Sequence, residues 1–311
     1  RQISTFDELA EQAKGIKRWG VLRMDVDNLG RLMREGFRSG DAQSTSSYLT
    51  ISRLASLSFA LRVFFDKCVP WAAMRPDSDM ASDAGPEVQH SARLYLQYAG
   101  GDDLFMVGAW DELPAAAAKI QSAFREFACR NPAVTISAGI ALFPSKFPIY
   151  QAAQVAHEAL DSAKAHASVL AFPGDGETRG KNAVHFLGVA LDWDAFQGVH
   201  ERAHRLAQWV DDGLARKSLI QRALRILCEW QSGRQRNIRQ GRLRQRQRYI
   251  GPWVWRATYQ FGRAASEIDA PEVRQDVRQW VGELLTDERN IVRLGLAARW
   301  AELLTRKRDD K

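Results

Sequence analysis

YLQYAGGDDLFMVG, residues 95–108, places two glycines and two adjacent aspartates in the middle of an otherwise continuous strand pattern. The segment ARLYLQYA before the glycines alternates apolar and polar residues, and LFMVGAW after them is mostly apolar. Gly100-Gly101 is a turn signal, because glycine adopts positive φ without steric cost. The stretch therefore predicts a β-hairpin with Asp102 and Asp103 at its tip. A tight turn alone also explains GGDD, so the flanking elements decide what it means.

Those flanking elements complete an α+β pattern. Residues 21–24 are an apolar run that ends at Asp25 and predicts a strand, and a helix is expected over 47–68. After the hairpin, Asp111 is expected to cap a helix that runs through Ala128. Residues 133–143 predict a strand, 149–166 a helix and 182–188 a last strand. This is the βαββαβ order of a ferredoxin-like domain.

In that topology the third strand lies between the first two and antiparallel to both, so the hairpin tip lies beside the end of the first strand. Asp25, Asp102 and Asp103 thereby meet at one edge of the sheet. Three such carboxylates repel one another unless divalent cations lie among them, and oxygen ligands favour Mg²⁺ or Mn²⁺. We therefore predict a nucleotide site that uses two of these ions.

The backbone near the carboxylates fits a phosphate chain. Gly100 and Gly101 leave no side chain where phosphates would approach. Residues 27–30, which begin with Asp27 and Asn28, would offer backbone amides to phosphate oxygens.

Five blocks of this first half resemble the second palm domain of the Cas-ten family, the large subunit of type III CRISPR effector complexes. The blocks are VLRMDVDNLG, LYLQYAGGDDLFMVGAW, VTISAGIAL, AHEALDSAK and KNAVHFLG. The helical tail, including WVWRATYQFGR, resembles the C-terminal helical domain of the Csm-type branch. The resemblance implies a nucleotidyl cyclase that joins ATP into cyclic oligoadenylate when the guide-bearing complex captures target RNA.

By the same resemblance, Asp25, Asp102 and Asp103 match metal-binding catalytic carboxylates. Gly100 and Gly101 match a turn next to the phosphates. Val26 is assigned as a metal and nucleotide ligand, and Lys164 as a residue that reaches the phosphates from a helix.

Family members carry a first palm domain, a zinc-binding segment and an HD nuclease, and we expect the first palm on a separate chain or in a missing segment. The sequence contains no His-Asp dipeptide, so DNA cleavage is not assigned to it. The implied partners are CRISPR RNA and target RNA, held through the complex, and other effector subunits. Among these are the small helical subunits, against which the tail would dock.

Composition supports a folded, two-domain protein. The chain has 311 residues, 45% of them hydrophobic, and shows neither a membrane-spanning run nor a secretion signal. We expect a cytoplasmic protein without a membrane partner. Three scattered cysteines indicate no disulfide framework.

Charge divides the chain near residue 192. Residues 1–192 carry 20 Lys and Arg against 22 Asp and Glu, whereas residues 193–311 carry 24 against 15. We expect a palm domain over 1–192 and a basic helical bundle over 193–311. In the bundle, the tryptophans at 209, 230, 280 and 300 have the spacing of core residues.

The positive charge of the bundle concentrates in one basic segment, residues 234–248, which has seven arginines and no acid. Such a segment repels itself unless an anion neutralises it, which favours nucleic-acid phosphate over a solvated loop. The predicted nucleic-acid-binding residues are Arg234, Arg236, Arg239, Arg242, Arg244, Arg246 and Arg248.

Other functions fit less of the sequence. A catalytically silent scaffold in the same complex would not require the intact GGDD. A diguanylate cyclase has a related GGDEF palm, but here Asp103-Leu104 replaces Glu-Phe. HERAH, residues 200–204, fits the HExxH pattern of zinc proteases, with Glu229 as a candidate third ligand. Arg202 within the motif and its arginine-rich surroundings favour a helix surface instead.

Overall fold

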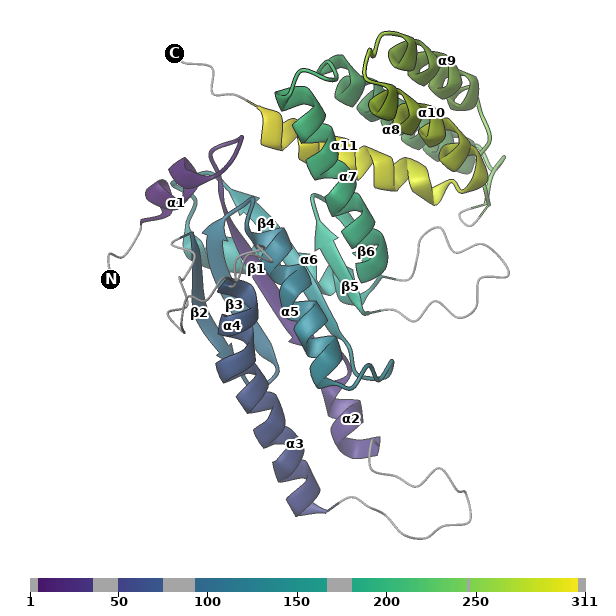
Figure 1. Ribbon diagram of the computed structural model, residues 1–311. Helices are drawn as coiled ribbons and strands as arrows, with labels where there is room; N and C mark the ends of the chain where they lie inside the picture. The colour runs from purple at the N-terminus through teal and green to yellow at the C-terminus, as the bar shows by residue number, and fades with distance from the viewer. Residues whose placement is uncertain (1–4, 36–49, 75–92, 167–180, 245–246, 307–311) are drawn as a thin grey trace. The chain divides into compact units, whose positions relative to one another are not determined.

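The computed structural model of the protein describes residues 5–35, 50–74, 93–166, 181–244 and 247–306 (Figure 1). The chain divides into two compact units. Of the described residues, the first unit holds those up to Trp193 apart from Lys14–Ile16, and the second unit holds the rest. No described helix combines the length and apolarity needed to cross a membrane.

The first unit is built on a six-stranded sheet with the order β2-β3-β1-β4-β5-β6. Its strands are β1 (Trp19–Val26), β2 (Leu94–Gly100), β3 (Asp103–Ala109), β4 (Ile136–Phe143), β5 (Ala183–Phe186) and β6 (Val189–Asp192). Strand β3 lies between β2 and β1 and is antiparallel to both. The predicted α+β class and the ferredoxin-like order of the first four strands are confirmed.

Two strands beyond that core extend the sheet. Strand β5 is parallel to β4 and reached through a helix, and β6 returns from β5 as an antiparallel hairpin. The hairpin turn is Leu187-Gly188, both with positive φ, as in a type I′ turn. The sequence reading ended at residue 188 and missed β6.

The helices of this unit are α1 (Phe6–Gln12), α2 (Leu29–Glu35), α3 (Ile51–Val63), α4 (Val69–Met74), α5 (Leu113–Phe127) and α6 (Ile149–Lys164). A π-helical turn, η1 (Phe64–Cys68), joins α3 to α4. The expected cap of α5 is wrong. The N-cap is Glu112, without a side-chain bond to the helix, because the Asp111 carboxylate accepts a 2.5 Å hydrogen bond from Arg93.

Helices cover both faces of the sheet (Figure 1). On one face, a Cβ at Gly20 would lie 2.7 Å from Leu113 of α5. On the other, a Cβ at Gly139 would lie 2.2 Å from the Leu160 nitrogen of α6, so only glycine permits this close approach. Gly139 is opposite Arg23 in the β1–β4 pairing. Because side chains alternate along a strand, Arg23 and Asp25 are on the face covered by α6.

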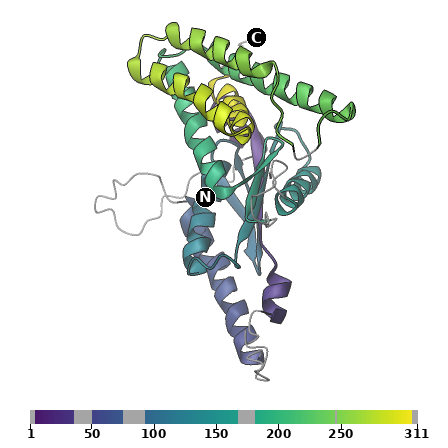
Figure 2. The same cartoon turned by 90° about the vertical axis from the view of Figure 1, so that its right-hand side faces the viewer.

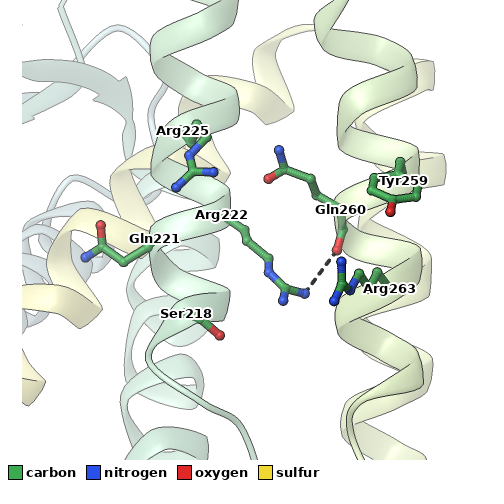
Figure 3. Close-up of a pocket in the computed structure, with 7 residues that line it drawn as sticks. All are labelled: Ser218, Gln221, Arg222, Arg225, Tyr259, Gln260 and Arg263. Carbon is green, nitrogen blue, oxygen red and sulfur yellow. Dashed lines mark hydrogen bonds between the residues drawn. The ribbon is translucent and has the colours of Figure 1, made fainter.

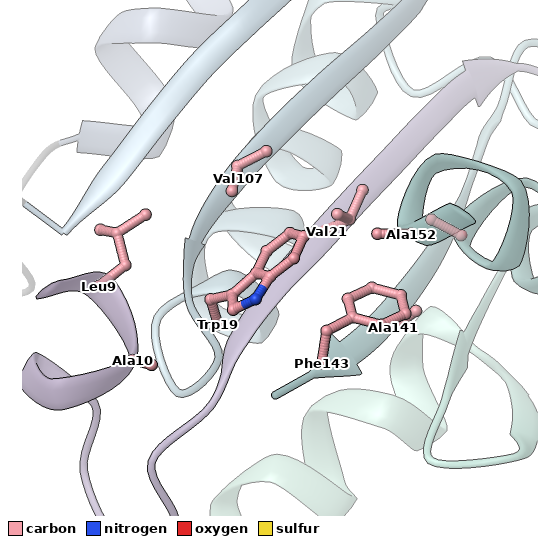
Figure 4. Packing of buried hydrophobic residues seen from close by; sticks show 9 residues of the cluster. Leu9, Ala10, Trp19, Val21, Val107, Ala141, Phe143 and Ala152 are labelled. Carbon is pink, nitrogen blue, oxygen red and sulfur yellow. The ribbon is translucent and has the colours of Figure 1, made fainter. Parts of the chain in front are cut away.

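Trp19 anchors the core on the α6 face, where Leu9 and Phe143 lie on either side of it (Figure 4). Its ring is fully buried, and it stacks on Phe6 with centroids 4.4 Å apart. The indole nitrogen donates a 2.8 Å hydrogen bond to the Pro144 carbonyl. This bond satisfies the polar atom that burial would otherwise leave unpaired.

The second unit is helical. It consists of α7 (Trp193–Asp211), α8 (Ser218–Arg239), α9 (Trp253–Ser266), α10 (Pro271–Thr286) and α11 (Arg289–Thr305). Helix α8 packs against α9 and α11, and α9 packs against α10 (Figure 2). The tryptophans at 209, 230, 280 and 300 are buried, which confirms their predicted place in the core.

Candidate nucleotide and metal site

The hairpin tip lies beside the end of β1. Asp25 is directly opposite Asp103 in the β1–β3 pairing, and Gly100 is opposite Asp103 across the hairpin. The Val26 amide donates a 2.9 Å hydrogen bond to the Asp102 carbonyl, which ties the turn to the strand end. The structure therefore brings together Asp25, Asp102 and Asp103, as the topology predicts.

The two glycines of the turn differ in conformation. Gly101 has a φ of +69°, a region that disfavours other residues, and a Cβ there would meet nothing within 4 Å. Gly100 ends β2 without a positive φ, and a Cβ there would make only ordinary contact, 3.5 Å from the Tyr98 hydroxyl. Local packing therefore does not require glycine at position 100, whereas open space for an approaching ligand would.

Basic side chains balance the carboxylates. The Lys164 ammonium, at the end of α6, contacts the Asp25 carboxylate, and both side chains are largely shielded, at 27% and 19% exposure. Arg23 lies 3.7 Å from the Asp103 carboxylate. Lys181 donates a 2.5 Å hydrogen bond to the Asn28 side-chain oxygen.

The electrostatics are those of a crowded, partly buried cluster. Burial raises the pKa of the Asp102 carboxyl, and the neighbouring charge of Asp103 raises it further. Burial lowers the pKa of Lys164, and the positive charges of Lys181 and Arg23 act in the same direction. Contact with Asp25 opposes that lowering, because a carboxylate favours the ammonium form. Lys164 and Arg23 thus each lie beside one carboxylate at this edge, while Lys181 bonds the Asn28 side chain.

Asp27 supports the site from within. Its side chain is 1% exposed and accepts hydrogen bonds from Thr135, Ser137 and the Asn182 amide at 2.8–3.0 Å. Its own amide donates to the Thr135 carbonyl at 2.8 Å. Neither group is free for a nucleotide in this structure, so the predicted role of Asp27 in nucleotide binding gains no support. Asn28, which is exposed and has a φ of +57°, begins the turn into α2.

Two residues next to the carboxylates were not assigned from the sequence. One is Arg23, whose signal was a charged residue in an apolar strand two positions before Asp25. The other is Tyr98, half-exposed beside a bulge in β2, whose hydroxyl donates a 3.0 Å hydrogen bond to the Gly100 carbonyl. The charge of Asp103 raises the pKa of the Tyr98 hydroxyl. No local pattern marked this contact.

A metal ion would have to compete for these carboxylates. Within the described ranges, no three acidic, imidazole or thiol side chains converge closely enough to hold an ion. Asp25 is instead engaged by Lys164, and Asp103 is near Arg23. The donors present are oxygens, which suit Mg²⁺ or Mn²⁺, so the residue types fit such an ion once Lys164 releases Asp25.

The basic segment spans a helix end and the loop after it. Arg234, Arg236 and Arg239 are on α8, the next described arginines are in the loop, and Arg246 is outside the described residues. All the described ones except Arg234 are exposed. Arg234 is near the Trp230 ring at 5.8 Å. Arg248 donates to the Leu285 carbonyl. The segment therefore offers cations to solvent from a partly anchored backbone.

The HERAH motif does not form a metal centre among the described residues. His200 and His204 are adjacent on α7, with ring centroids 4.4 Å apart, and both contact the buried Trp300 ring. The candidate third ligand, Glu229, is 3.1 Å from Arg256. The sequence favoured a helix surface over zinc binding, and His204 is indeed exposed, whereas His200 is half-buried.

Comparison with known proteins gives a consistent family. Residues 18–169 match the model of the family described as Cas10/Cmr2, second palm domain. Two relatives are each named CRISPR system single-strand-specific deoxyribonuclease Cas10/Csm1 (subtype III-A). The one from Mycobacterium tuberculosis is 37% identical over 229 residues, and the one from Methanocaldococcus jannaschii is 36% identical over 198. The matches cover 72% and 62% of this chain but only 26% and 23% of the relatives.

Solved structures share the fold. The Csm1 structure from T. onnurineus has a TM-score of 0.63 at 22% identity, covering 98% of this chain and 40% of that one. A Csm1-Csm4 cassette in complex with pppApApA has a TM-score of 0.63 at 20% identity, covering 98% and 39%. The chain thus spans about a quarter of the curated relatives and about two fifths of these structures.

Proposed function

Residues 18–169 belong to the Cas10/Cmr2 second palm domain family, and from this premise we propose that the chain is part of the large subunit of a type III-A CRISPR effector. In this proposal the palm converts ATP into cyclic oligoadenylate when the assembled complex binds target RNA. The similar Csm1-Csm4 structures include complexes with cA4, with AMPPNP and with one ATP, which supports adenine nucleotides as the ligands of this palm.

One observation carries the proposal. Register pairing sets Asp25 opposite Asp103, with Asp102 in the adjoining turn, while Gly100 leaves space that the fold itself does not need. Carboxylates beside an open, glycine-lined backbone suit a metal-bound triphosphate better than they suit a structural turn.

The carboxylates of Asp25, Asp102 and Asp103 and the Val26 carbonyl are the proposed ligands for two Mg²⁺ or Mn²⁺ ions. When bound, these ions would neutralise triphosphate charge and lower the pKa of the attacking hydroxyl. In the structure, the Asp25 carboxylate contacts the Lys164 ammonium, which such an ion would have to displace.

The basic residues have a separate task. Lys164, Lys181 and Arg23 lie near the carboxylates. If a bound triphosphate drew Lys164 away from Asp25, the ammonium would exchange a carboxylate partner for a phosphate. We propose that Lys164 then orients the phosphates, because a flexible ammonium turns toward either partner at little cost. Gly101 shapes the turn through its positive φ, and Asn28 stands immediately before α2.

The reaction requires a second nucleotide. Phosphoryl transfer depends largely on the positioning of nucleophile and leaving group, and this palm supplies carboxylates from one side only. A first palm domain, on another chain or in a longer polypeptide, would hold the partner ATP. The other proposed partners are a Csm4-like subunit, small helical subunits docked on residues 193–311, and the guide and target RNA. The basic segment would contact phosphate.

A silent scaffold in the same complex is the second candidate. It predicts that the parent complex shows no ATP turnover and that replacing the carboxylates changes at most assembly or stability. The two functions separate in one experiment on the assembled complex.

The experiment replaces Asp102 and Asp103 together with asparagine and measures ATP turnover and target-RNA affinity on the same preparation. We expect turnover to fall about a thousandfold, equivalent to about 4 kcal/mol of transition-state stabilisation, with RNA affinity unchanged. The matched control, Asp161→Asn with Glu158→Gln, removes two exposed carboxylates from α6 and should leave both measurements intact. Full turnover in the Asp102/Asp103 variant would refute the assignment, and loss of RNA binding would make the carboxylates structural.

A further inference from the structure

A groove runs between α8 and α9 in the helical unit. It has a volume of about 260 Å³ and is lined by Ser218, Gln221, Arg222, Arg225, Tyr259, Gln260 and Arg263. Figure 3 shows Arg222 and Arg225 on the α8 wall, with Gln260 and Arg263 on the α9 wall. We call it the α8–α9 groove.

The groove carries net positive charge. Three of its lining residues are arginines and none is acidic. Glu267, at one end, pairs with Arg222 at 3.0 Å and with Arg263 at 3.1 Å. One carboxylate therefore offsets two guanidinium groups. Within the part of the chain that the structure describes, Arg225 is exposed and has no hydrogen bond or ion pair. The groove thus has guanidinium donors in excess of its own acceptors.

A buried acceptor faces the same space. The side-chain oxygen of Gln260 is buried and, among the described residues, has no hydrogen-bond partner. Figure 3 shows its amide pointing from α9 toward α8, on the side of Arg225. A buried polar atom without a partner costs free energy, so a ligand that donates a hydrogen bond here would recover it.

Aromatic side chains continue the groove along α9. Tyr259 is 63% exposed and Trp255, one helical turn earlier, is 60% exposed. Residues four apart share a helix face. Trp255 already carries the Arg256 guanidinium at 5.2 Å from its ring centroid. The core tryptophans of this unit are buried, so Trp255 is unlike them in presenting its ring to solvent.

We propose that the α8–α9 groove binds single-stranded nucleic acid. Arg225 and the arginines beside it would contact phosphates, while Tyr259 and Trp255 would stack unpaired bases. This combination of cationic groove and exposed rings is how sequence-tolerant single-strand sites are built. The Gln260 oxygen would accept a hydrogen bond from an exocyclic base amine, which cytosine has and uracil lacks. Duplex bases are already stacked, so the site favours single strands.

The inference goes beyond the proposed cyclase. It concerns the other compact unit and involves none of the palm carboxylates, so it stands or falls separately. An acidic protein segment would use the arginines equally well but would gain nothing from base stacking or from the Gln260 acceptor. The test uses this difference.

The experiment measures fluorescence anisotropy of labelled oligocytidine and oligouridine, each about 12 nucleotides, a length typical of single-strand sites, on the full chain. Replacing both Trp255 and Tyr259 with leucine should weaken oligocytidine binding at least about fivefold. The control Tyr150→Leu removes a comparably exposed ring from α6 and should change nothing. Gln260→Leu should remove the preference for oligocytidine over oligouridine.

The role of the arginines is tested by the salt dependence of oligocytidine affinity. Arg225→Gln should reduce the slope of log affinity against log salt by about 0.7, whereas Arg278→Gln, on the exposed surface of α10, should not. Circular dichroism verifies folding of each variant. Parent-like oligocytidine binding by the folded double aromatic variant overturns the proposal. The proposal is also overturned if oligoglutamate displaces oligocytidine and binds the parent and the aromatic variant equally. That result would indicate a site for an acidic protein segment.

Discussion

Replacing Lys164 with methionine should tighten Mn²⁺ binding to the nucleotide-free chain while it impairs turnover in the assembled complex. The change keeps an unbranched side chain only one atom shorter but removes the ammonium that contacts Asp25. Lys164 therefore acts in opposite directions in the two measurements. It competes with the ion before nucleotide arrives and holds phosphates afterwards.

The magnitude follows from the geometry of the pair. Two unit charges about 4 Å apart interact by about 1 kcal/mol in water and about 4 kcal/mol at the effective dielectric near a protein surface. Both side chains keep some exposure, 27% and 19%, and solvent screening favours the lower part of that range. A net gain of about 1–2 kcal/mol corresponds to about a five- to thirtyfold tighter Mn²⁺ complex.

The assay is a titration in which electron paramagnetic resonance detects free Mn²⁺. Lys146→Met, an exposed residue away from the carboxylates, is the matched control and should leave affinity unchanged. Asp25→Asn should cancel the gain, so that adding Lys164→Met to it has no further effect, as expected for directly coupled residues. Equal or weaker Mn²⁺ binding by the folded Lys164→Met variant would refute the competition between ammonium and ion.

Three further outcomes are expected. The purified 311-residue chain should make little or no oligoadenylate, because half a site cannot position a second nucleotide; robust synthesis by a demonstrated monomer would contradict the need for a second palm. Replacing the exposed arginines of the basic segment with glutamine should make RNA-dependent assembly less sensitive to salt, by about 0.7–0.9 in slope for each arginine–phosphate pair that the substitutions abolish, and an unchanged slope would remove the segment from the RNA interface. Burial lowers the pKa of His185, so the unfolded chain binds the extra proton first and stability should fall as pH drops from about 6.5 through that lowered pKa. Urea unfolding at several pH values should show a smaller loss of unfolding free energy at low pH in His185→Gln but not in His157→Gln. Equal losses in the two variants would exclude the partly buried His185 imidazole as the cause of the pH dependence.

The sequence predicts the sheet well where local and global signals agree. The hairpin at residues 100–103 has both glycine chemistry and strand alternation, and the handedness of the crossover then determines that β3 lies next to β1. The opposition of Asp25 and Asp103 follows from those two rules without knowledge of the residues between them. For this reason, a site formed by residues far apart in the sequence could be predicted.

The misses depend on partners that only folding supplies. Asp25 and Asp27 are both aspartates two positions apart at the end of β1. Thr135 and Ser137 nevertheless donate hydrogen bonds to the buried Asp27 carboxylate, whereas the Asp25 carboxylate contacts Lys164. Likewise, Asp111 has cap chemistry, but Arg93 on the neighbouring strand end engages its carboxylate. Local propensity cannot anticipate such competition, because each competing group is remote in sequence.

The close approach of α6 to Gly139 determines where the end of the helix, and with it Lys164, lies relative to Asp25. The buried residues of α6 are four alanines and one leucine, Ala152, Ala156, Ala159, Leu160 and Ala163. The distance between the helix and β4 is therefore determined largely by backbone contact at Gly139. Lys164 comes about two helical turns beyond Ala156, and its reach to Asp25 inherits any tilt introduced below. A methyl group at position 139 would push α6 away from β4. The Lys164 ammonium would move with the helix, although the methyl group does not contact it. We therefore expect substitution of Gly139 to reduce ATP turnover, although glycine has no side chain that could take part in the reaction.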